Sequence, residues 1–334
     1  MTELKVLDAR PRGATYLAQP ARSVLNPPAQ TGMDFWSLNP YVGCEFGCTY
    51  CYARYTHRYL VERAHDAGKL DDAEFREYRG PNGWEAFERK IFVKERLLDA
   101  LERDLGRFFR AGGNDTIVIG TATDPYQPAE RRYHLTRAVL ERLARHEGLS
   151  IGIITKSPLV VRDADVLSRL AARNDVEVHI SLTTVDPAVI RALEARSPLP
   201  TARLRALAAL SAAGVPAGLI VAPVLPGITD GAAQLDALFR AGRAAGARYV
   251  HASPLRLYAA TRERFLPVLA AAYPALEARY RAAYQRQSSA PRAYARALQR
   301  RIQRLQRKYG FGVNDGMRDR YRHRSHRAQL ELDV

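Results

Sequence analysis

Three cysteines, Cys44, Cys48 and Cys51, lie within eight residues in the segment CEFGCTYC and are the only cysteines of the 334-residue chain. An odd number of clustered thiols does not suit a disulfide framework and favours metal ligation. A loop with this spacing can hold three thiolates around one face of a 4Fe-4S cluster. The chain has no fourth cysteine, so one iron of such a cluster would bind something other than a side-chain thiolate.

Two other interpretations of these thiols stay open at this stage. Structural zinc is usually closed by four ligands, and His57 is the only histidine near in sequence that could complete the set. The thiols could also be packed core residues, although Gly43 and Gly47 make the segment poor helix or strand material. The same two glycines predict a loop whose backbone closely approaches a bound group.

The rest of the chain has the composition of a globular protein that can position such a loop. Hydrophobic residues make up 47% and charged residues 26%, which excludes disorder as the main state. The formal net charge of +16 favours a polyanionic partner. No apolar run reaches the length of a membrane span, and the N-terminal segment MTELKVLDARPRG lacks the apolar core of a signal peptide. We therefore expect a cytoplasmic protein with no membrane partner.

Short β-branched runs alternate with amphipathic segments about six times, which predicts βα units. The expected strands cover residues 35–42, 116–120, 150–155, 176–183, 217–224 and 248–253. The expected helices cover 52–64, a segment around 135–143, 163–173, one segment that the chain enters through Pro187, one that is capped by Thr201, and one that opens at Asp230. Such units predict an α/β fold with a parallel sheet that can curl into a partial (β/α)6 TIM-like barrel. An open doubly wound sheet is the competing architecture.

The organisation predicted along the chain has three parts. Residues 1–34 form an N-terminal extension, residues 35–260 a core domain, and residues 261–334 a basic helical C-terminal region. Within the core, residues 65–113 are rich in charge and are interpreted as an insertion. This insertion contains the short run Lys90 to Lys94 and ends in a long helix from Glu95 to Phe109.

The cysteine pattern, with Tyr50 before the last cysteine, resembles that of the radical S-adenosylmethionine (radical SAM) enzymes. The six βα units are similar to the partial barrel of that family, so the resemblance covers residues 35–260. The strings NPYVGCEFGCTYCYARYTHR, TATDPYQPAE and APVLPGITD resemble more narrowly the branch that contains spore photoproduct lyase.

The resemblance implies a specific chemistry. Cys44, Cys48 and Cys51 would bind a 4Fe-4S cluster whose open iron chelates S-adenosylmethionine. One electron from an external donor of the flavodoxin or ferredoxin type would cleave the cofactor to methionine and a 5′-deoxyadenosyl radical, which abstracts a hydrogen atom from a substrate.

The resemblance also implies which side chains contact the cofactor, while the catalytic residues stay unassigned. A strand-two hydroxyl, a strand-three lysine and a strand-four serine of the family match Thr123, Lys156 and Ser181 by motif order. Lys156 would pair with the cofactor carboxylate. The full set is Tyr50, Thr123, Lys156, Ser181, Thr183 and Val221, with Val221 on an apolar shelf against adenine. A structural role for each of them is the alternative, as it is for Glu130, Glu194 and Arg196, which also match family positions.

The positive charge is concentrated near the C-terminus. Residues 279–327 hold 15 Lys or Arg and two acidic residues. Residues 288–308 predict a helix, capped by Ser288 or Ser289, with an apolar face of Tyr294, Leu298, Ile302 and Leu305. Another face carries Arg292, Arg296, Arg300, Arg304 and Arg307, a stripe that can follow phosphates. A solvated helix face is the alternative, and residues 317–327 are expected to be a basic arm without fixed structure when no partner is bound.

The main expectation is a radical SAM enzyme that acts on nucleic acid, by lyase, transferase or other modifying chemistry. Spore photoproduct lyase uses an additional cysteine as hydrogen donor, whereas all three cysteines here are assigned to the cluster. Thymine-dimer reversal by that route is therefore not expected. A peptide or small-metabolite substrate is one alternative. A non-enzymatic, metal-containing nucleic-acid-binding protein is the alternative from another class.

Overall fold

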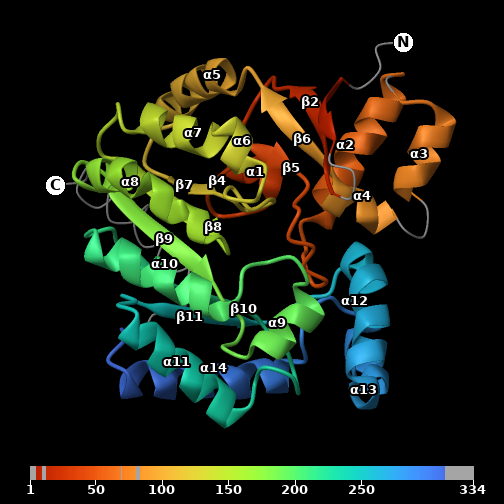
Figure 1. Ribbon diagram of the computed structural model, residues 1–334, viewed down its shortest axis with the longest axis vertical. Coiled ribbons are helices and arrows are strands. Elements are labelled where there is room, and N and C mark those ends of the chain that lie inside the picture. Colours follow the sequence, from red (N-terminus) through yellow and green to blue (C-terminus); the bar gives the residue numbers. More distant parts are fainter. Residues whose placement is uncertain (1–4, 10–12, 69, 80–82, 313–334) are drawn as a thin grey trace.

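Six parallel strands make up most of the larger sheet in the computed structural model, which describes residues 5–9, 13–68, 70–79 and 83–312 (Figure 1). They are β4 (Trp36–Leu38), β7 (Thr116–Ile119), β8 (Ser150–Thr155), β9 (Asp175–Ser181), β10 (Ala217–Val224) and β11 (Val250–Pro254). The short β3 (Leu25–Asn26) pairs with β4 in the antiparallel sense. The strands follow one another in chain order without a reversal. A doubly wound sheet reverses its order, so the prediction of a partial (β/α)6 barrel is confirmed.

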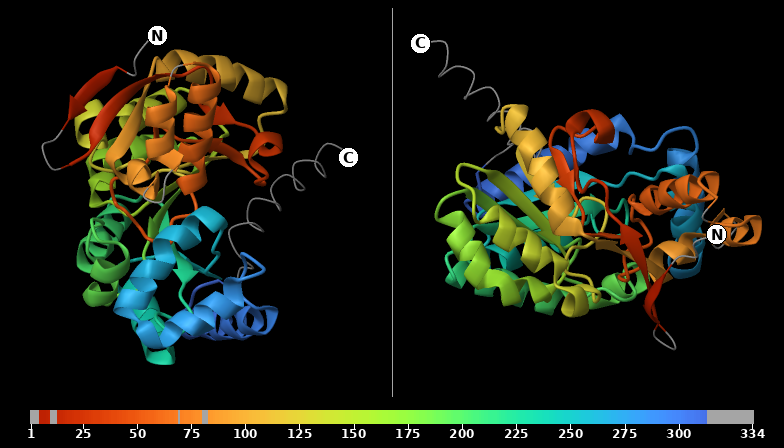
Figure 2. Two further views of the ribbon diagram at one scale, coloured as in Figure 1. Left: turned by 90° about the vertical axis from the view of Figure 1, so that its right-hand side faces the viewer. Right: turned by 90° about the horizontal axis from the view of Figure 1, so that it is seen from above.

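Helices cover the outer face of this sheet and bury its apolar side (Figures 1 and 2). They include α7 (Leu135–Leu143), α8 (Ala164–Ala171), α10 (Pro200–Ala212) and α11 (Ala232–Ala244). Each contributes leucines to one core together with strand residues such as Ile117, Ile151, Val178 and Leu219. Parallel strands covered in this way read as continuous apolar runs, which is why the sequence revealed them. Helix α10 begins at Pro200 after Leu199 as N-cap, so the cap predicted at Thr201 was wrong by two residues.

A second, smaller sheet was not predicted. Its four strands run in the order β1 (Val6–Ala9), β2 (Thr15–Pro20), β6 (Lys90–Glu95) and β5 (Tyr41–Val42). The strand expected over 35–42 is therefore two strands in two sheets, separated at Pro40, which has no N–H to donate to a ladder. The run Lys90 to Lys94, expected in an insertion, is β6, which pairs with β2 and β5.

The segment between the cysteines and β7 is mainly helical. It contains α2 (Arg54–Asp66), α3 (Asp72–Arg79), α4 (Gly83–Arg89) and α5 (Leu97–Arg110). Helices α2 and α5 each begin two residues after the expected start. The remaining short helical elements are α1 (Pro28–Thr31), α6 (Glu130–Tyr133), the 3-10 helix η1 (Pro158–Asp163) and α9 (Pro187–Leu193).

Three helices follow β11: α12 (Ala259–Ala272), α13 (Pro274–Tyr284) and α14 (Arg292–Lys308). Helix α14 begins four residues later than expected, because Pro291 rather than a serine occupies the N-cap. Its Leu298, Ile302 and Leu305 are buried, as predicted.

Helix α14 lies beneath β11 (Figure 1), and Gln306 Nε2 donates to the carbonyl of Val250 in that strand at 2.9 Å. It therefore covers an edge that would otherwise be open to pairing. The basic arm predicted at 317–327 lies outside the described residues. No helix in the described part of the chain is both long and apolar enough to cross a membrane.

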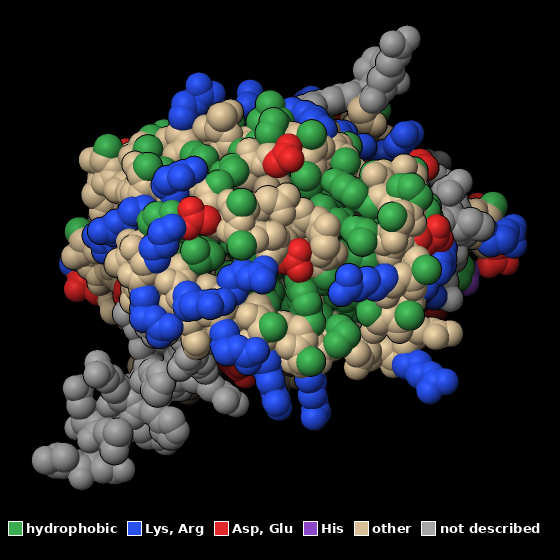
Figure 3. Space-filling model, turned by 90° about the horizontal axis from the view of Figure 1, so that it is seen from below, with side chains coloured by type: hydrophobic (Ala, Val, Ile, Leu, Met, Phe, Trp, Pro, Cys, Tyr) green, Lys and Arg blue, Asp and Glu red, His purple; other side chains and the backbone are tan. Residues whose placement is uncertain are grey.

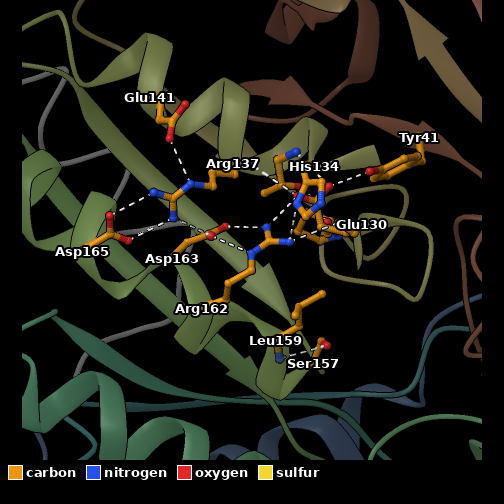
Figure 4. A network of polar contacts seen from close by, with 12 residues as sticks. Tyr41, Glu130, His134, Arg137, Glu141, Ser157, Leu159, Arg162, Asp163 and Asp165 are labelled. Atoms are coloured by element: carbon orange, nitrogen blue, oxygen red, sulfur yellow. Dashed lines mark hydrogen bonds and ion pairs between the residues drawn. The ribbon is translucent and has the colours of Figure 1, made fainter. Parts of the chain in front are cut away.

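A buried polar network anchors the strand that leads into the cysteine segment (Figure 4). The hydroxyl of Tyr41 in β5 donates to Glu130 Oε2 at 2.5 Å, and the fully buried Glu130 carboxylate pairs with Arg162 at 2.8 Å. Arg162 is shared with Asp163 at 2.8 Å, and Arg137 reaches Asp163 at 3.1 Å. The network ties the smaller sheet to the helical layer of the larger one.

We expect Glu130→Gln to lower the free energy of unfolding by about 2 kcal/mol, because the mostly buried Arg162 loses one of its two carboxylate partners. Glu141→Gln is the matched control, since the exposed Glu141 pairs with Arg137 at 2.9 Å at the surface and should contribute less than about 1 kcal/mol. Urea unfolding followed by circular dichroism measures both. Equal losses in the two variants would contradict the role given to the network.

Candidate active site

The three cysteines lie in the loop that joins β5 to α2, and hydrogen bonds hold the backbone of this loop from two sides. The N–H of Cys44 donates to the carbonyl of Phe87 in α4 at 2.9 Å. The N–H of Thr49 donates to the carbonyl of Leu193 in α9 at 2.9 Å. Cys44 and Cys48 are buried and Cys51 is partly exposed, so the loop is open toward Cys51.

The three thiols share one apolar cluster and act on one another electrostatically. Burial raises the pKa of Cys44, and nearby acidic and thiol groups raise it further. Burial also raises the pKa of Cys48 and of Cys51. The Lys156 ammonium acts to lower the pKa of Cys48, and the Arg54 guanidinium acts to lower that of Cys51. Buried thiolates that repel one another need a bound cation to stay ionised, and thiolates are the usual ligands of iron-sulfur clusters. This donor set therefore fits a 4Fe-4S cluster.

Among the described residues, no group of three or more His, Cys, Asp or Glu side chains is arranged to hold a metal ion. In a cubane cluster each thiolate binds a different iron, so its three sulfur atoms do not converge on one point.

Two glycines give the loop its path. Gly43 and Gly47 have φ values of +88° and +64°. A Cβ on Gly43 would lie 2.9 Å from the carbonyl oxygen of Phe87, and a Cβ on Gly47 would lie 2.7 Å from Glu88 Oε2. The structure thus shows close approach to protein groups that line the loop, and close approach to a bound group stays a prediction.

Thr123, expected to contact the cofactor, hydrogen-bonds to the cysteine loop. Its hydroxyl donates to the carbonyl of Gly43 at 2.6 Å. The side-chain amide of Gln127 donates to the same carbonyl at 3.0 Å, and Gln127 Oε1 accepts from the N–H of Glu45 at 3.0 Å. Gln127 is fully buried and was not predicted, because its partners in the loop lie 82 and 84 residues away along the chain.

Lys156, Ser181 and Tyr50, three of the expected cofactor residues, lie together. The ammonium of Lys156 donates to the Ser181 hydroxyl at 2.8 Å and lies 5.7 Å from the centre of the Tyr50 ring. The Tyr50 hydroxyl donates to Glu194 Oε1, which is also 3.8 Å from the Lys156 ammonium. Burial lowers the pKa of Lys156, and the Cys48 thiol opposes that effect. A single cation therefore connects the ends of β8 and β9 to the cysteine loop.

A buried ion pair supports this group from behind. Arg203 and Glu194 are both fully buried and bind each other. Arg203 also donates to the carbonyl of Ser181 and to that of Pro198, each at 2.8 Å. Arg203 was not predicted as part of the site, because the sequence alone does not distinguish it from an exposed arginine on a helix surface.

The remaining two expected cofactor residues lie in different environments. Thr183 is buried just beyond the end of β9. Ser181 pairs in register with Ile220, and Ile180 with Leu219. Because side chains alternate along a strand, Val221 lies on the opposite face of the sheet from Ser181, within the main hydrophobic core. The arginines expected to bind nucleic acid lie on α14, a separate element from the cysteine loop.

His57, the histidine considered as a zinc ligand, is a buried structural residue. Its Nε2–H donates to the carbonyl of Lys90 at 3.0 Å. The ring lies among those of Tyr78, Phe87 and Phe92, at centroid distances of 5.5, 6.2 and 5.3 Å. Its hydrogen bond and aromatic packing account for its position without a metal.

Comparison with known proteins gives three findings. A family model described as Radical SAM superfamily matches residues 38–238. An uncharacterized protein of Mycobacterium tuberculosis is 36% identical over 299 residues, which cover 89% of this chain and 82% of that protein. A mutant of spore photoproduct lyase with bound AdoMet and dinucleoside spore photoproduct superposes with a TM-score of 0.62. Its identity is 14%, over 88% of this chain and 79% of that one, and the likeness shows the fold alone.

The buried His57 should make folding sensitive to acid. Burial lowers its pKa from 6.5 to about 4, against the effect of the Lys90 carbonyl. Between these pH values the unfolded chain binds more protons at this residue than the folded chain. The free energy of unfolding therefore falls as the pH falls, by about 3 kcal/mol in total.

Denaturant titrations of the metal-free protein between pH 6.5 and pH 4.5 test this expectation. His57→Gln keeps an N–H donor for Lys90 and removes the titration, so its stability should depend less on pH. His65→Gln, at a more exposed histidine on the same helix, should keep the wild-type slope. Identical slopes for the wild type and His57→Gln would show that the burial of His57 has no such effect.

Proposed function

The chain belongs to the radical SAM superfamily, and from this membership we propose that Cys44, Cys48 and Cys51 hold a 4Fe-4S cluster beside a site for S-adenosylmethionine. Enzymes of this superfamily use that cluster and that cofactor. Membership makes the chain an enzyme and sets aside the non-enzymatic alternative. Bound together, the two groups supply a 5′-deoxyadenosyl radical that abstracts a hydrogen atom from the substrate.

The observation that carries the proposal is the position of Lys156. Its ammonium, on a side chain that is 13% exposed, lies at the carboxyl end of β8. It interacts electrostatically with the Cys48 thiol and donates a hydrogen bond of 2.8 Å to Ser181. A lysine in this position binds the carboxylate of an amino acid cofactor as a point charge. Ser181 and Thr183 then supply hydroxyls for the amino group or the ribose, and the Tyr50 ring lies beside the ammonium.

Thr123 and Val221 take different roles in this proposal. Thr123 fixes the cysteine loop through Gly43, and we propose that it also borders the cofactor site. The apolar position that faces the site on β10 is Ile220, which pairs with Ser181, rather than Val221.

Nucleic acid is the substrate class that the surface favours. Arg292, Arg296, Arg300, Arg304 and Arg307 are all exposed along one face of α14. Arg300, Arg304 and Arg307 line one groove with Gln303. Figure 3 shows Lys and Arg side chains gathered on the lower face of the molecule, where α14 lies. Guanidinium groups at this spacing bind successive phosphates.

The likeness to spore photoproduct lyase, whose structures contain a dinucleoside photoproduct, supports the same substrate class. A peptide or small metabolite remains the second candidate if α14 serves only to cover β11.

Radical SAM enzymes generally need an electron donor, and we propose one of the flavodoxin or ferredoxin type. We also propose a cytoplasmic location, because three unpaired thiols persist in a reducing compartment.

Anaerobic reconstitution followed by dithionite and S-adenosylmethionine tests the enzyme. The wild type should bind iron and sulfide and release 5′-deoxyadenosine, and Cys51→Ala should lose both properties. Lys156→Met should keep the cluster and weaken cofactor binding by about tenfold, because one charge-assisted hydrogen bond is lost. Lys308→Met removes an exposed lysine and is the control. A colourless wild-type protein, or unchanged cofactor affinity in Lys156→Met, would refute the assignments.

Binding to single-stranded DNA or RNA at several salt concentrations tests the substrate class. The triple variant Arg300→Gln, Arg304→Gln and Arg307→Gln should reduce the slope of log affinity against log salt by about 2 to 3. Arg58→Gln, Arg169→Gln and Arg205→Gln together remove the same charge from scattered exposed positions and should change the slope far less. Salt-independent binding, or none, would favour the small-molecule alternative.

A further inference from the structure

One buried carboxylate, Glu88 in α4, gathers three arginines from three other parts of the chain. Its oxygens lie 2.6 Å from Arg54 Nη2 in α2 and 3.3 Å from Arg264 Nε in α12. The third partner is Arg196, which follows α9. The side chains of Glu88 and Arg54 are only 3% and 2% exposed, whereas that of Arg196 is 48% exposed. No motif in the sequence marked Glu88.

Two of these arginines also bind the backbone of the cysteine loop. Arg54 Nη2 donates to the carbonyl of Cys48 at 2.8 Å. Arg196 Nε donates to the carbonyl of Glu45 at 2.6 Å. The backbone N–H of Arg196 donates to the carbonyl of Phe46 at 3.3 Å. Glu88 therefore orients the guanidinium groups that fix the loop on both sides of Gly47.

The packing at Gly47 shows that the arrangement is tight. A Cβ there would lie 2.5 Å from Arg196 Nη2 and 2.7 Å from Glu88 Oε2. The neighbouring carbonyl of Phe87, also from α4, accepts the N–H of Cys44 at 2.9 Å. Helix α4 thus lines the loop with a carbonyl and a carboxylate.

Such an assembly is costly to bury, so its position calls for a reason other than stability. Burial acts to raise the pKa of Glu88, but Arg54, Arg196 and Arg264 lower it, so the carboxylate stays ionised. Apolar side chains of similar volume commonly give equal or greater stability than a buried ion pair. What they cannot supply is a set of directed N–H donors to loop carbonyls.

We propose that Glu88 is a positioning residue that prepares the cysteine loop for its cluster, with Arg54 and Arg196 as the two groups through which it acts. The inference rests on the proposed function, since it assumes that the three cysteines hold a cluster. It also gives a role to residues 65–113: this segment carries α4, and α4 brings Glu88 and Phe87 to the loop. The four side chains carry two net positive charges near the thiolates, which favours the reduced cluster.

The test compares full-length variants after anaerobic reconstitution. Arg196→Gln is the main variant, because Arg196 is half exposed and its loss leaves Glu88 paired with Arg54 and Arg264. Glu88→Gln is the second. Outer hydrogen-bond partners of metal ligands typically contribute about tenfold in affinity, so both variants should lose iron to a chelator about ten times more readily. The midpoint potential of Arg196→Gln should shift to a more negative value.

The control is Arg58→Gln, which removes an exposed arginine from α2, the helix that carries Arg54. It should match the wild type in iron retention and in midpoint potential. Thermal unfolding of the metal-free proteins separates positioning from general destabilisation: a lower melting temperature with unchanged iron retention and potential would overturn the inference. Wild-type behaviour of Arg196→Gln and Glu88→Gln would also overturn it. A wild type that binds no cluster would refute the proposed function itself.

Discussion

The constraint on which the site depends is the burial of three thiols in an apolar pocket. Burial is the main cause that raises the pKa of Cys44, Cys48 and Cys51, so these side chains are uncharged unless a cation is bound. Uncharged thiols are weak hydrogen-bonding groups and cannot hold the loop in shape by themselves. Its shape is imposed instead through backbone groups, by donors and acceptors from elements that are distant in sequence.

Two buried carboxylates carry out complementary parts of this task. Glu88 acts on the loop carbonyls through Arg54 and Arg196. Glu194 binds the hydroxyl of Tyr50 and lies near the ammonium of Lys156, so it relates the loop to the ends of β8 and β9. The proposed cluster ligands and the proposed cofactor ligands are thus held by two ion-pair networks that meet at the loop. Both networks use the segment after α9, where Glu194 and Arg196 lie two residues apart.

The larger sheet and the place of the cysteine loop could be predicted because local signals suffice for them. Apolar runs such as TIVIG and SIGIIT indicate buried strands. In such a fold the site lies at the carboxyl ends of the strands, which is where polar residues such as Lys156 occur. The break at Pro40 was missed because Trp36 to Val42 looks continuous when only its composition is considered. Gln127, Glu88 and Arg203 were missed because their partners are set by tertiary packing. A buried glutamine and an exposed one look the same in a single sequence.

The two faces of helix α14 differ in their surroundings. Its inward leucines and Gln306 shield the last strand of an incomplete barrel, and its outward arginines contact solvent. Substitutions on the exposed face of α14 therefore need not affect the packing of its buried face. Substitutions at the arginines can therefore alter the proposed contacts with a partner while the inner face still covers β11.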